Sequence, residues 1–183
     1  DREQPETALN TIYMLDTTPD TDKMKWVSLP PFPGEGRILS TAAVCDSTLF
    51  IIGGCSLSRD NSGETSRTYL SDMIGYDMTS KDPSKWGSSG RQQLAGPGMP
   101  VAAAAGPAPV RENSILLIGG DKRGNSPDPS RPVVQSRDIL VYDVIGNTWT
   151  RQGEWPVGIA TVPAVVRGSE IMTISGETAP GVR

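Results

Sequence analysis

Three short segments of the chain repeat one order of apolar and polar positions. Residues 41–52, 107–118 and 162–174 each contain an apolar stretch, two or three polar turn residues and a second, largely apolar run of four. Small residues follow each copy, as Gly-Gly twice and Ser-Gly once. The turn lengths fit β-hairpins, and short apolar runs suit strands that are buried on both faces. The pattern therefore predicts three hairpins, each followed by a tight backbone bend.

A second pair of strands is predicted after each of the first two hairpins. Its first strand ends in Tyr-Asp, and a tryptophan marks its second strand. The two full copies and one N-terminal variant are residues 72–77 with Trp86, 138–143 with Trp149 and 11–16 with Trp26. Buried tyrosine and tryptophan contribute large packing areas, so we expect them to pack between neighbouring sheets rather than to bind a ligand.

Successive tryptophans of this series lie 60 and 63 residues apart, which indicates a structural repeat. The period is long because residues 56–69 and 121–136 insert segments rich in Ser, Arg, Asp, Gly and Pro. We expect these segments to be solvated loops, and two readings stay open for them: the rim of a binding face, or disorder.

The order of Gly-Gly, Tyr and Trp resembles the kelch repeat, whose blades are four-stranded antiparallel sheets of a β-propeller. The resemblance implies an all-β fold with half a blade at 1–36, whole blades at 37–98 and 99–156, and half a blade at 157–183. These amount to about three blades, whereas propellers typically close with about four or more. Open sheet edges associate readily, so we expect a second chain, a second copy or further blades to complete the ring.

The composition limits the classes of partner and the kinds of catalytic site that are expected. The net charge of −4 argues against nucleic acid as a partner, and no apolar run approaches the roughly 18 residues that cross a bilayer. The chain has no histidine, which removes Ser-His-Asp catalysis and nearly all His-ligated metal sites. Cys45 lies beside a predicted turn and Cys55 beyond the far end of the same hairpin, so we expect two separate thiols. No secretory signal opens at residue 1, which predicts a mature chain or a fragment.

The third copy differs from the others directly after its small residues. Residues 176–183 read Gly-Glu-x-x-Pro-Gly-x-Arg, with Glu177 and Arg183 at the two charged positions. Cys55 and Asp121 stand at the place of Glu177 in the other two copies. This segment resembles a loop of the bacterial N-acetylneuraminate epimerase (sialic acid mutarotase) family. Residues 15–41 and 151–158 also run in the same order as in that family.

The resemblance implies a six-bladed propeller that interconverts the α- and β-anomers of N-acetylneuraminate, in the periplasm and without cofactor or metal. It implies that Glu177 and Arg183 act in catalysis, since both match the family's loop residue for residue. Arg37 also matches an arginine of the family, which suggests a contact to a substrate carboxylate or hydroxyl. The alternative for Arg37 is a salt bridge at the rim.

Three other readings compete with the mutarotase. A sialidase-related propeller would carry Asp-box turns, but residues 143–149 are one residue too long and Val141 stands where serine is needed. A copper oxidase of kelch type would need histidine ligands. A non-enzymatic kelch module that binds a protein or a glycan through its loops remains the main rival. The acid at Glu177 favours the enzyme over this scaffold.

Overall fold

The computed structural model describes residues 8–18, 23–82, 84, 99–100, 103–122 and 135–179, and the structural statements below concern these residues. Thirteen strands form, all paired antiparallel, so the predicted all-β fold class is confirmed. No helix in this part of the chain is long and apolar enough to cross a membrane. The strands are β1 (Ile12–Asp16), β2 (Lys25–Leu29), β3 (Thr41–Cys45), β4 (Thr48–Ile52), β5 (Cys55–Arg59), β6 (Thr65–Tyr69), β7 (Met73–Asp77), β8 (Val110–Arg111), β9 (Ser114–Ile118), β10 (Asp138–Asp143), β11 (Thr148–Glu154), β12 (Ala164–Arg167) and β13 (Glu170–Thr173).

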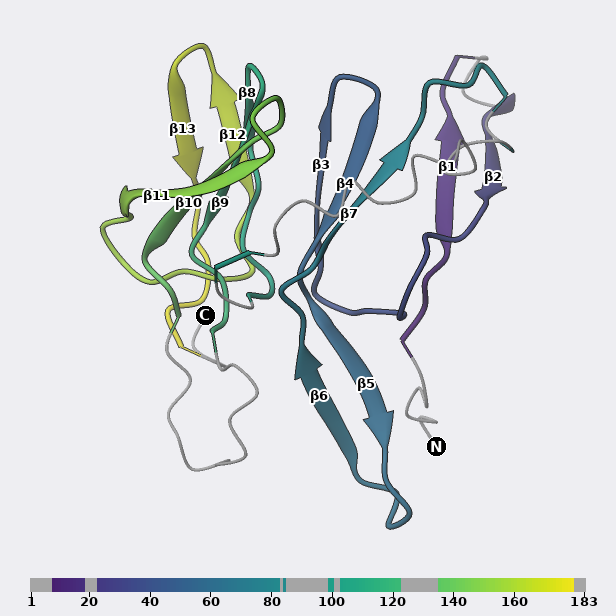
Figure 1. Ribbon diagram of the computed structural model, residues 1–183, viewed down its shortest axis with the longest axis horizontal. Helices are drawn as coiled ribbons and strands as arrows, with labels where there is room; N and C mark the ends of the chain where they lie inside the picture. Colours follow the sequence, from purple (N-terminus) through teal and green to yellow (C-terminus); the bar gives the residue numbers. More distant parts are fainter. Residues whose placement is uncertain are drawn as a thin grey trace.

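The strands group into four sheets and one projecting hairpin. β8, β9, β10 and β11 pair in chain order as a four-stranded sheet, and β3, β4 and β7 form a three-stranded one. β1–β2 and β12–β13 are two-stranded sheets. Figure 1 shows these four sheets as a row, with β12–β13 at one end and β1–β2 at the other. The β5–β6 hairpin separates β4 from β7 in the chain and projects below the row.

The three hairpins predicted from the repeat are confirmed as β3–β4, β8–β9 and β12–β13. The first strand of the second hairpin is shorter than expected. It was predicted from residue 107, but β8 begins at Val110. Pro107 and Pro109 cannot donate a backbone hydrogen bond, so regular pairing starts only after them.

One predicted loop is instead a strand pair. Residues 55–69 form β5 and β6, joined by a turn in which the Asp60 carboxylate accepts hydrogen bonds from the backbone N–H groups of Ser62 and Glu64. The expectation of a solvated loop was wrong. The apolar residues of these strands, Cys55, Leu57 and Tyr69, are few and lie towards one end of the pair, so the apolar pattern of a strand is weak. Most of the other predicted loop, 121–136, and Trp86 lie outside the described residues.

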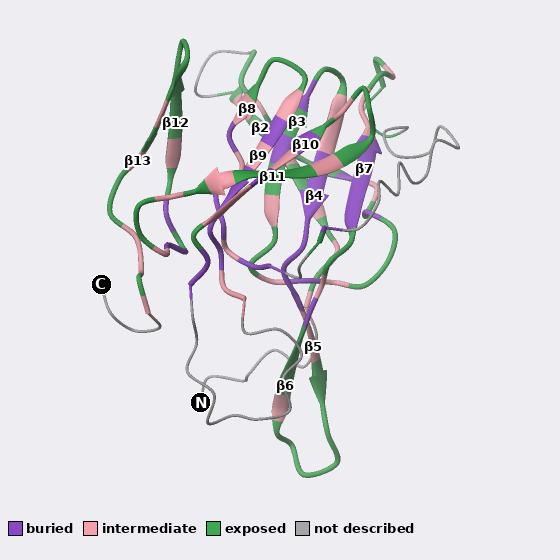
Figure 2. Ribbon diagram, turned by 60° about the vertical axis from the view of Figure 1, so that its left-hand side comes forward, coloured by how far each residue is buried: buried purple, intermediate pink, exposed green. Residues whose placement is uncertain are grey.

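The core lies between the three-stranded and the four-stranded sheets. Phe50 of β4 meets Tyr142 of β10 edge to face, with the ring centroids 5.8 Å apart. Tyr142 also contacts Trp149 of β11 at 5.2 Å. Tyr142 and Tyr76 are 0% and 1% exposed, which confirms the expected packing role of these tyrosines. Figure 2 shows burial concentrated in these central sheets, while β5–β6 is largely exposed.

Backbone hydrogen bonds join neighbouring sheets along the edge of the row at which β4 and β9 end. Gly54, just after β4, donates its N–H to the carbonyl of Ala103 at 3.0 Å. Gly120, just after β9, donates in the same way to Ile159 at 2.7 Å. A Cβ atom on the preceding Gly53 would lie 2.3 Å from that Ala103 carbonyl oxygen, and one on Gly54 would lie 2.7 Å from the Ile38 carbonyl oxygen of its own sheet. The repeated small residues are therefore required for the close approach of one sheet to the next.

Replacement of Gly54 by alanine is expected to destabilise the fold by about 3 kcal/mol, because the new Cβ meets backbone atoms at a φ of +93°. Gly168 in the β12–β13 turn is the matched control. It has a φ of +57° but no atom within 4 Å of its added Cβ, so Gly168→Ala should cost only about 1 kcal/mol. Urea unfolding of both variants measures the difference, and equal losses would contradict the role given to Gly54.

Candidate functional site

The residue after each small pair occupies the same backbone position in three successive sheets. Each one forms an isolated antiparallel bridge to the segment that leads into the first strand of the hairpin that it follows. The three bridges join Cys55 to Ile38, Asp121 to Ala104 and Glu177 to Ala160. The equivalence seen in the sequence is therefore also an equivalence of backbone pairing.

These three positions belong to one backbone ladder. The bridges alternate with the hydrogen bonds from Gly54 and Gly120 to the neighbouring sheets. The ladder runs along the end of the sheets at which β4 and β9 finish, close to the C label in Figure 1. Cys55, Asp121 and Glu177 therefore lie in consecutive sheets at the same end of the molecule.

Glu177 is half-buried, and its backbone is held firmly. Its N–H donates to the Ala160 carbonyl and its carbonyl accepts from the Ala160 N–H, both at 2.9 Å. Gly176 precedes it with a φ of +116°, a conformation that favours glycine. The sheet thus places a carboxylate at the end of the row without a helix or a long loop. Arg183 lies outside the described residues, so its proximity to Glu177 stays a prediction.

The two equivalent positions carry other chemistry. Cys55 is fully buried, and this burial raises the pKa of its thiol to about 11. Cys45 is also a free, buried thiol, so the prediction of two separate cysteines is confirmed. A thiol with so high a pKa is protonated at neutral pH, which makes Cys55 a packing residue and not a nucleophile.

Asp121 brings a second carboxylate to this end of the sheets. The hydroxyl of Tyr69, the last residue of β6, donates to the Asp121 carboxylate at 2.6 Å. This bond ties the projecting β5–β6 hairpin to the neighbouring sheet. Sequence reasoning placed Asp121 at the right repeat position but did not select it as a site residue. The contact of Tyr69 could not be predicted, because no local sequence pattern shows which distant residue a tyrosine hydroxyl will bind.

Arg37 is engaged in a buried ion pair. Its two terminal nitrogens donate to the two carboxylate oxygens of Asp72 at 2.7 and 2.9 Å, and one also donates to the Gly53 carbonyl at 3.1 Å. Its guanidinium carbon lies 5.5 Å from the centre of the Phe32 ring. The structure therefore gives Arg37 the salt bridge that was the alternative for it. Substrate binding by Arg37 would have to compete with Asp72, and it stays a prediction.

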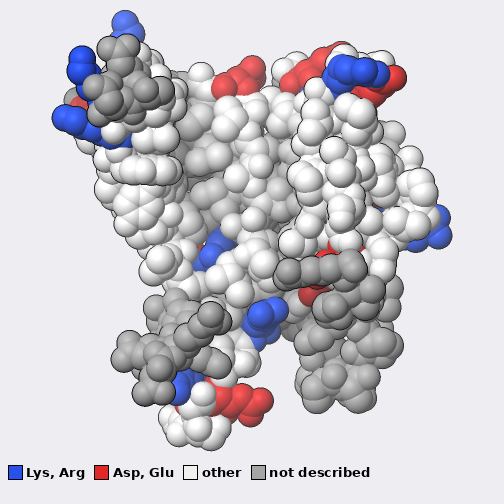
Figure 3. All heavy atoms as spheres, turned by 180° about the vertical axis from the view of Figure 1, so that it is seen from behind, with Lys and Arg blue, Asp and Glu red and all other residues white. Residues whose placement is uncertain are grey.

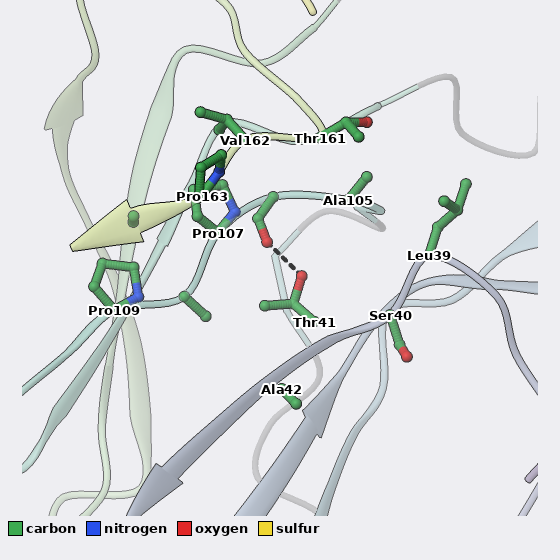
Figure 4. Close-up of a pocket in the computed structure, with 13 residues that line it drawn as sticks. Leu39, Ser40, Thr41, Ala42, Ala105, Pro107, Pro109, Thr161, Val162 and Pro163 are labelled. Carbon is green, nitrogen blue, oxygen red and sulfur yellow. Dashed lines mark hydrogen bonds between the residues drawn. The ribbon is translucent and has the colours of Figure 1, made fainter. Parts of the chain in front are cut away.

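A groove of about 540 Å³ runs between the innermost segments of three sheets. Its walls are residues 39–42, 105–109 and 161–164, and none of these residues is charged. Figure 4 shows the Thr41 hydroxyl pointing to the Gly106 carbonyl, to which it donates a hydrogen bond across the groove. The groove can hold a neutral, hydroxylated group, whereas charge recognition must come from the ends of the sheets.

Figure 3, drawn from behind, shows charged side chains at the top and the sides of this face and a few more near its middle, among mostly uncharged atoms. No group of three or more Asp, Glu, Cys or His side chains that could hold a metal ion occurs among the residues described. The candidate site therefore contains two acids, Asp121 and Glu177, on a backbone ladder, and carboxylates of this kind can transfer protons.

No family model matches the chain. It is 23% identical over 93% of its length to N-acetylneuraminate epimerase of Yersinia enterocolitica, and 26% identical over 95% to N-acetylneuraminate epimerase 1 of Escherichia coli. Among solved structures, YjhT superposes with a TM-score of 0.70 at 22% identity, over 94% of this chain and 54% of that one.

The chain is thus distantly similar to N-acetylneuraminate epimerases over most of its length. It spans about half the length of these curated relatives, 47% and 50% of the two named. The likeness to YjhT shows a shared fold over about half of that structure.

Loss of Asp72 and loss of Arg37 should lower the free energy of unfolding by different amounts, because the Arg37 side chain is 2% exposed and the Asp72 side chain 49%. Asp72→Ala leaves a buried cation without its counter-charge and is expected to cost about 3 kcal/mol. Arg37→Met leaves only a solvated carboxylate and should cost about 1 kcal/mol. Urea unfolding at neutral pH compares the two, and the opposite order would show that the pair is not buried as described.

Proposed function

We propose that this chain is about half of a kelch-type β-propeller whose complete ring interconverts the α- and β-anomers of N-acetylneuraminate. The observation that carries the proposal is the place of Glu177. It stands after the small pair of the third repeat, on a fixed backbone bridge, in a chain that is similar to N-acetylneuraminate epimerases over most of its length. The family resemblance of residues 176–183 supports the same assignment.

The reaction needs two proton transfers and no cofactor. A base removes the proton of the anomeric hydroxyl, the bond between the anomeric carbon and the ring oxygen breaks, and the ring oxygen takes up a proton. Rotation of the open keto acid and reclosure on the other face give the second anomer. In this proposal the Glu177 carboxylate is the base, and its protonated form then acts as the acid.

Arg183 takes the second role in the proposal. The substrate carries a carboxylate next to the reacting carbon, and an arginine can hold it through two parallel hydrogen bonds. This contact would orient the anomeric centre towards Glu177. General acid–base catalysis contributes about 10²–10⁴-fold, roughly 3–5 kcal/mol, which suffices for a reaction that already proceeds in water.

The propeller architecture is supported by the row of sheets and by their repeated connections. In the proposal, the blades are residues 37–98 and 99–156, flanked by half blades at 1–36 and 157–183, and the full ring has six. Arg37 lies in the first whole blade. It can contact a substrate only if its hydrogen bonds to Asp72 break. A periplasmic location follows from the family resemblance and belongs to the proposal as well.

One observation favours a second candidate, a kelch module that binds a protein or a glycan. The β5–β6 hairpin projects beyond the sheets and is largely exposed. Tyr69 ties it to Asp121, so it is held in a defined direction, as a recognition arm would be. This candidate predicts binding to a partner without acceleration of anomer exchange.

Glu177→Gln should lower the acceleration of anomer exchange by about 10²-fold or more, because glutamine cannot accept the proton. Glu170→Gln is the matched control. Glu170 lies on the β12–β13 hairpin that precedes Glu177, is exposed and pairs with Arg167, so its loss should leave the rate unchanged. NMR of a freshly dissolved, single anomer of N-acetylneuraminate, with the assembled ring, measures both rates. Equal rates for Glu177→Gln and the unmodified chain would refute the mechanism, and partner binding without acceleration would favour the scaffold.

A further inference from the structure

Three equivalent residues form the end of the groove that adjoins the backbone ladder. Leu39, Ala105 and Thr161 are the first groove residues of their segments, and each directly follows a residue of one of the three bridges. Figure 4 shows them together at one end of the groove. This end lies next to the candidate site, because Thr161 follows Ala160, the bridge partner of Glu177.

All three residues have a left-handed backbone, which the contacts between the sheets require. Their φ values are +57°, +58° and +54°. The Ala105 N–H donates to the Leu39 carbonyl and the Thr161 N–H donates to the Ala105 carbonyl, both at 2.8 Å. This conformation is unfavourable for residues other than glycine, and strained residues of this kind gather at ligand-binding and catalytic sites.

Of the three residues, Thr161 is the least suited to a left-handed backbone. Threonine branches at Cβ, and a branched side chain is a rare exception in this region, whereas glycine or asparagine adopts it routinely. The Thr161 side chain is exposed, and its hydroxyl makes no hydrogen bond to any residue that the structure describes. Within this part of the chain, no hydrogen bond of the side chain therefore offsets the strain. A contact with a ligand would explain why threonine stands here.

We propose that the Thr161 hydroxyl binds the substrate beside Glu177, as the hydrogen-bond partner of a sugar hydroxyl group. Ala160 and Glu177 exchange both backbone hydrogen bonds, and the Cα atoms of such a pair lie about 5.5 Å apart. The Cα atom of Thr161 is one residue further on, so it lies within about 9 Å of the Glu177 Cα atom. The hydroxyl and the carboxylate can therefore contact the same sugar ring.

The groove beyond Thr161 suits the uncharged part of a sugar acid. None of its lining residues is charged, and its volume of about 540 Å³ is in the range of pockets that bind small molecules. The charged end of the substrate would stay at the ladder, and its hydroxylated part would extend past Thr161 into the groove. The inference rests on the proposed function for the identity of the ligand, and it adds a residue that positions the sugar.

Thr161→Val removes the hydroxyl and keeps the branched Cβ, so it separates the hydrogen bond from the strain. For the assembled ring, the KM of anomer exchange and the Kd of N-acetylneuraminate from ligand-observed NMR should both rise about 3–10-fold, with kcat unchanged. Thr161→Ser keeps the hydroxyl and should bind as the unmodified chain does. Thr148→Val is the matched control, because Thr148 is exposed at the start of β11 and does not line the groove.

Thr161→Gly tests whether the strain is kept for binding. Glycine adopts the left-handed conformation freely, so this variant should unfold at a higher urea concentration than the unmodified chain. It also lacks the hydroxyl, so it should bind the sugar as weakly as Thr161→Val. A variant that is more stable but binds less well marks a residue that serves function at the expense of stability.

The outcomes separate this inference from the proposed function. The inference is overturned, and the proposed function stands, if Thr161→Val matches the unmodified chain, if Thr161→Ser or Thr148→Val weakens binding equally, or if Thr161→Gly is no more stable. Binding that weakens in Thr161→Val, without any acceleration by the unmodified ring, would overturn the proposed function alone. A ring that neither binds N-acetylneuraminate nor accelerates its anomer exchange would overturn both.

Discussion

The close approach of neighbouring sheets at one end is the constraint on which the rest of the structure depends. Gly54 and Gly120 donate their N–H groups directly to the backbone of the next sheet. This contact needs residues without a Cβ, since a Cβ atom on the preceding Gly53 or Gly119 would lie 2.3 or 2.4 Å from the accepting carbonyl oxygen of the next sheet. It brings the inner segments of three sheets close enough to enclose the groove, and it aligns the bridges that follow.

The same constraint makes one position available for different chemistry in each repeat. The residue after the small pair is held by two backbone hydrogen bonds whatever its side chain. Cys55 uses the position for packing, Asp121 uses it to hold the Tyr69 hydroxyl, and Glu177 leaves a half-buried carboxylate there. A repeat fold can acquire a functional group in this way without any change in its backbone.

The centre and the ends of the row differ in how far their apolar side chains are buried. Central strands such as β9 and β10 bury their apolar residues between two sheets, and the buried Arg37 guanidinium pairs with Asp72 beside the start of β7. The end sheets have a neighbour on one side only, so their equivalent residues stay exposed (Figure 2).

The sequence by itself determined the three hairpins, the positions of Tyr76 and Tyr142 and the equivalence of Cys55, Asp121 and Glu177, because each is a local pattern that recurs along the chain. The tertiary structure alone decided the partner of Arg37, since a bond to Asp72 spans 35 residues and leaves no local pattern. It also decided that residues 55–69 form a hairpin, whose strands carry few apolar residues, and how far the side chains of each sheet are exposed. Exposure depends on which sheet stands next to which, and that arrangement is set only when distant segments pack together.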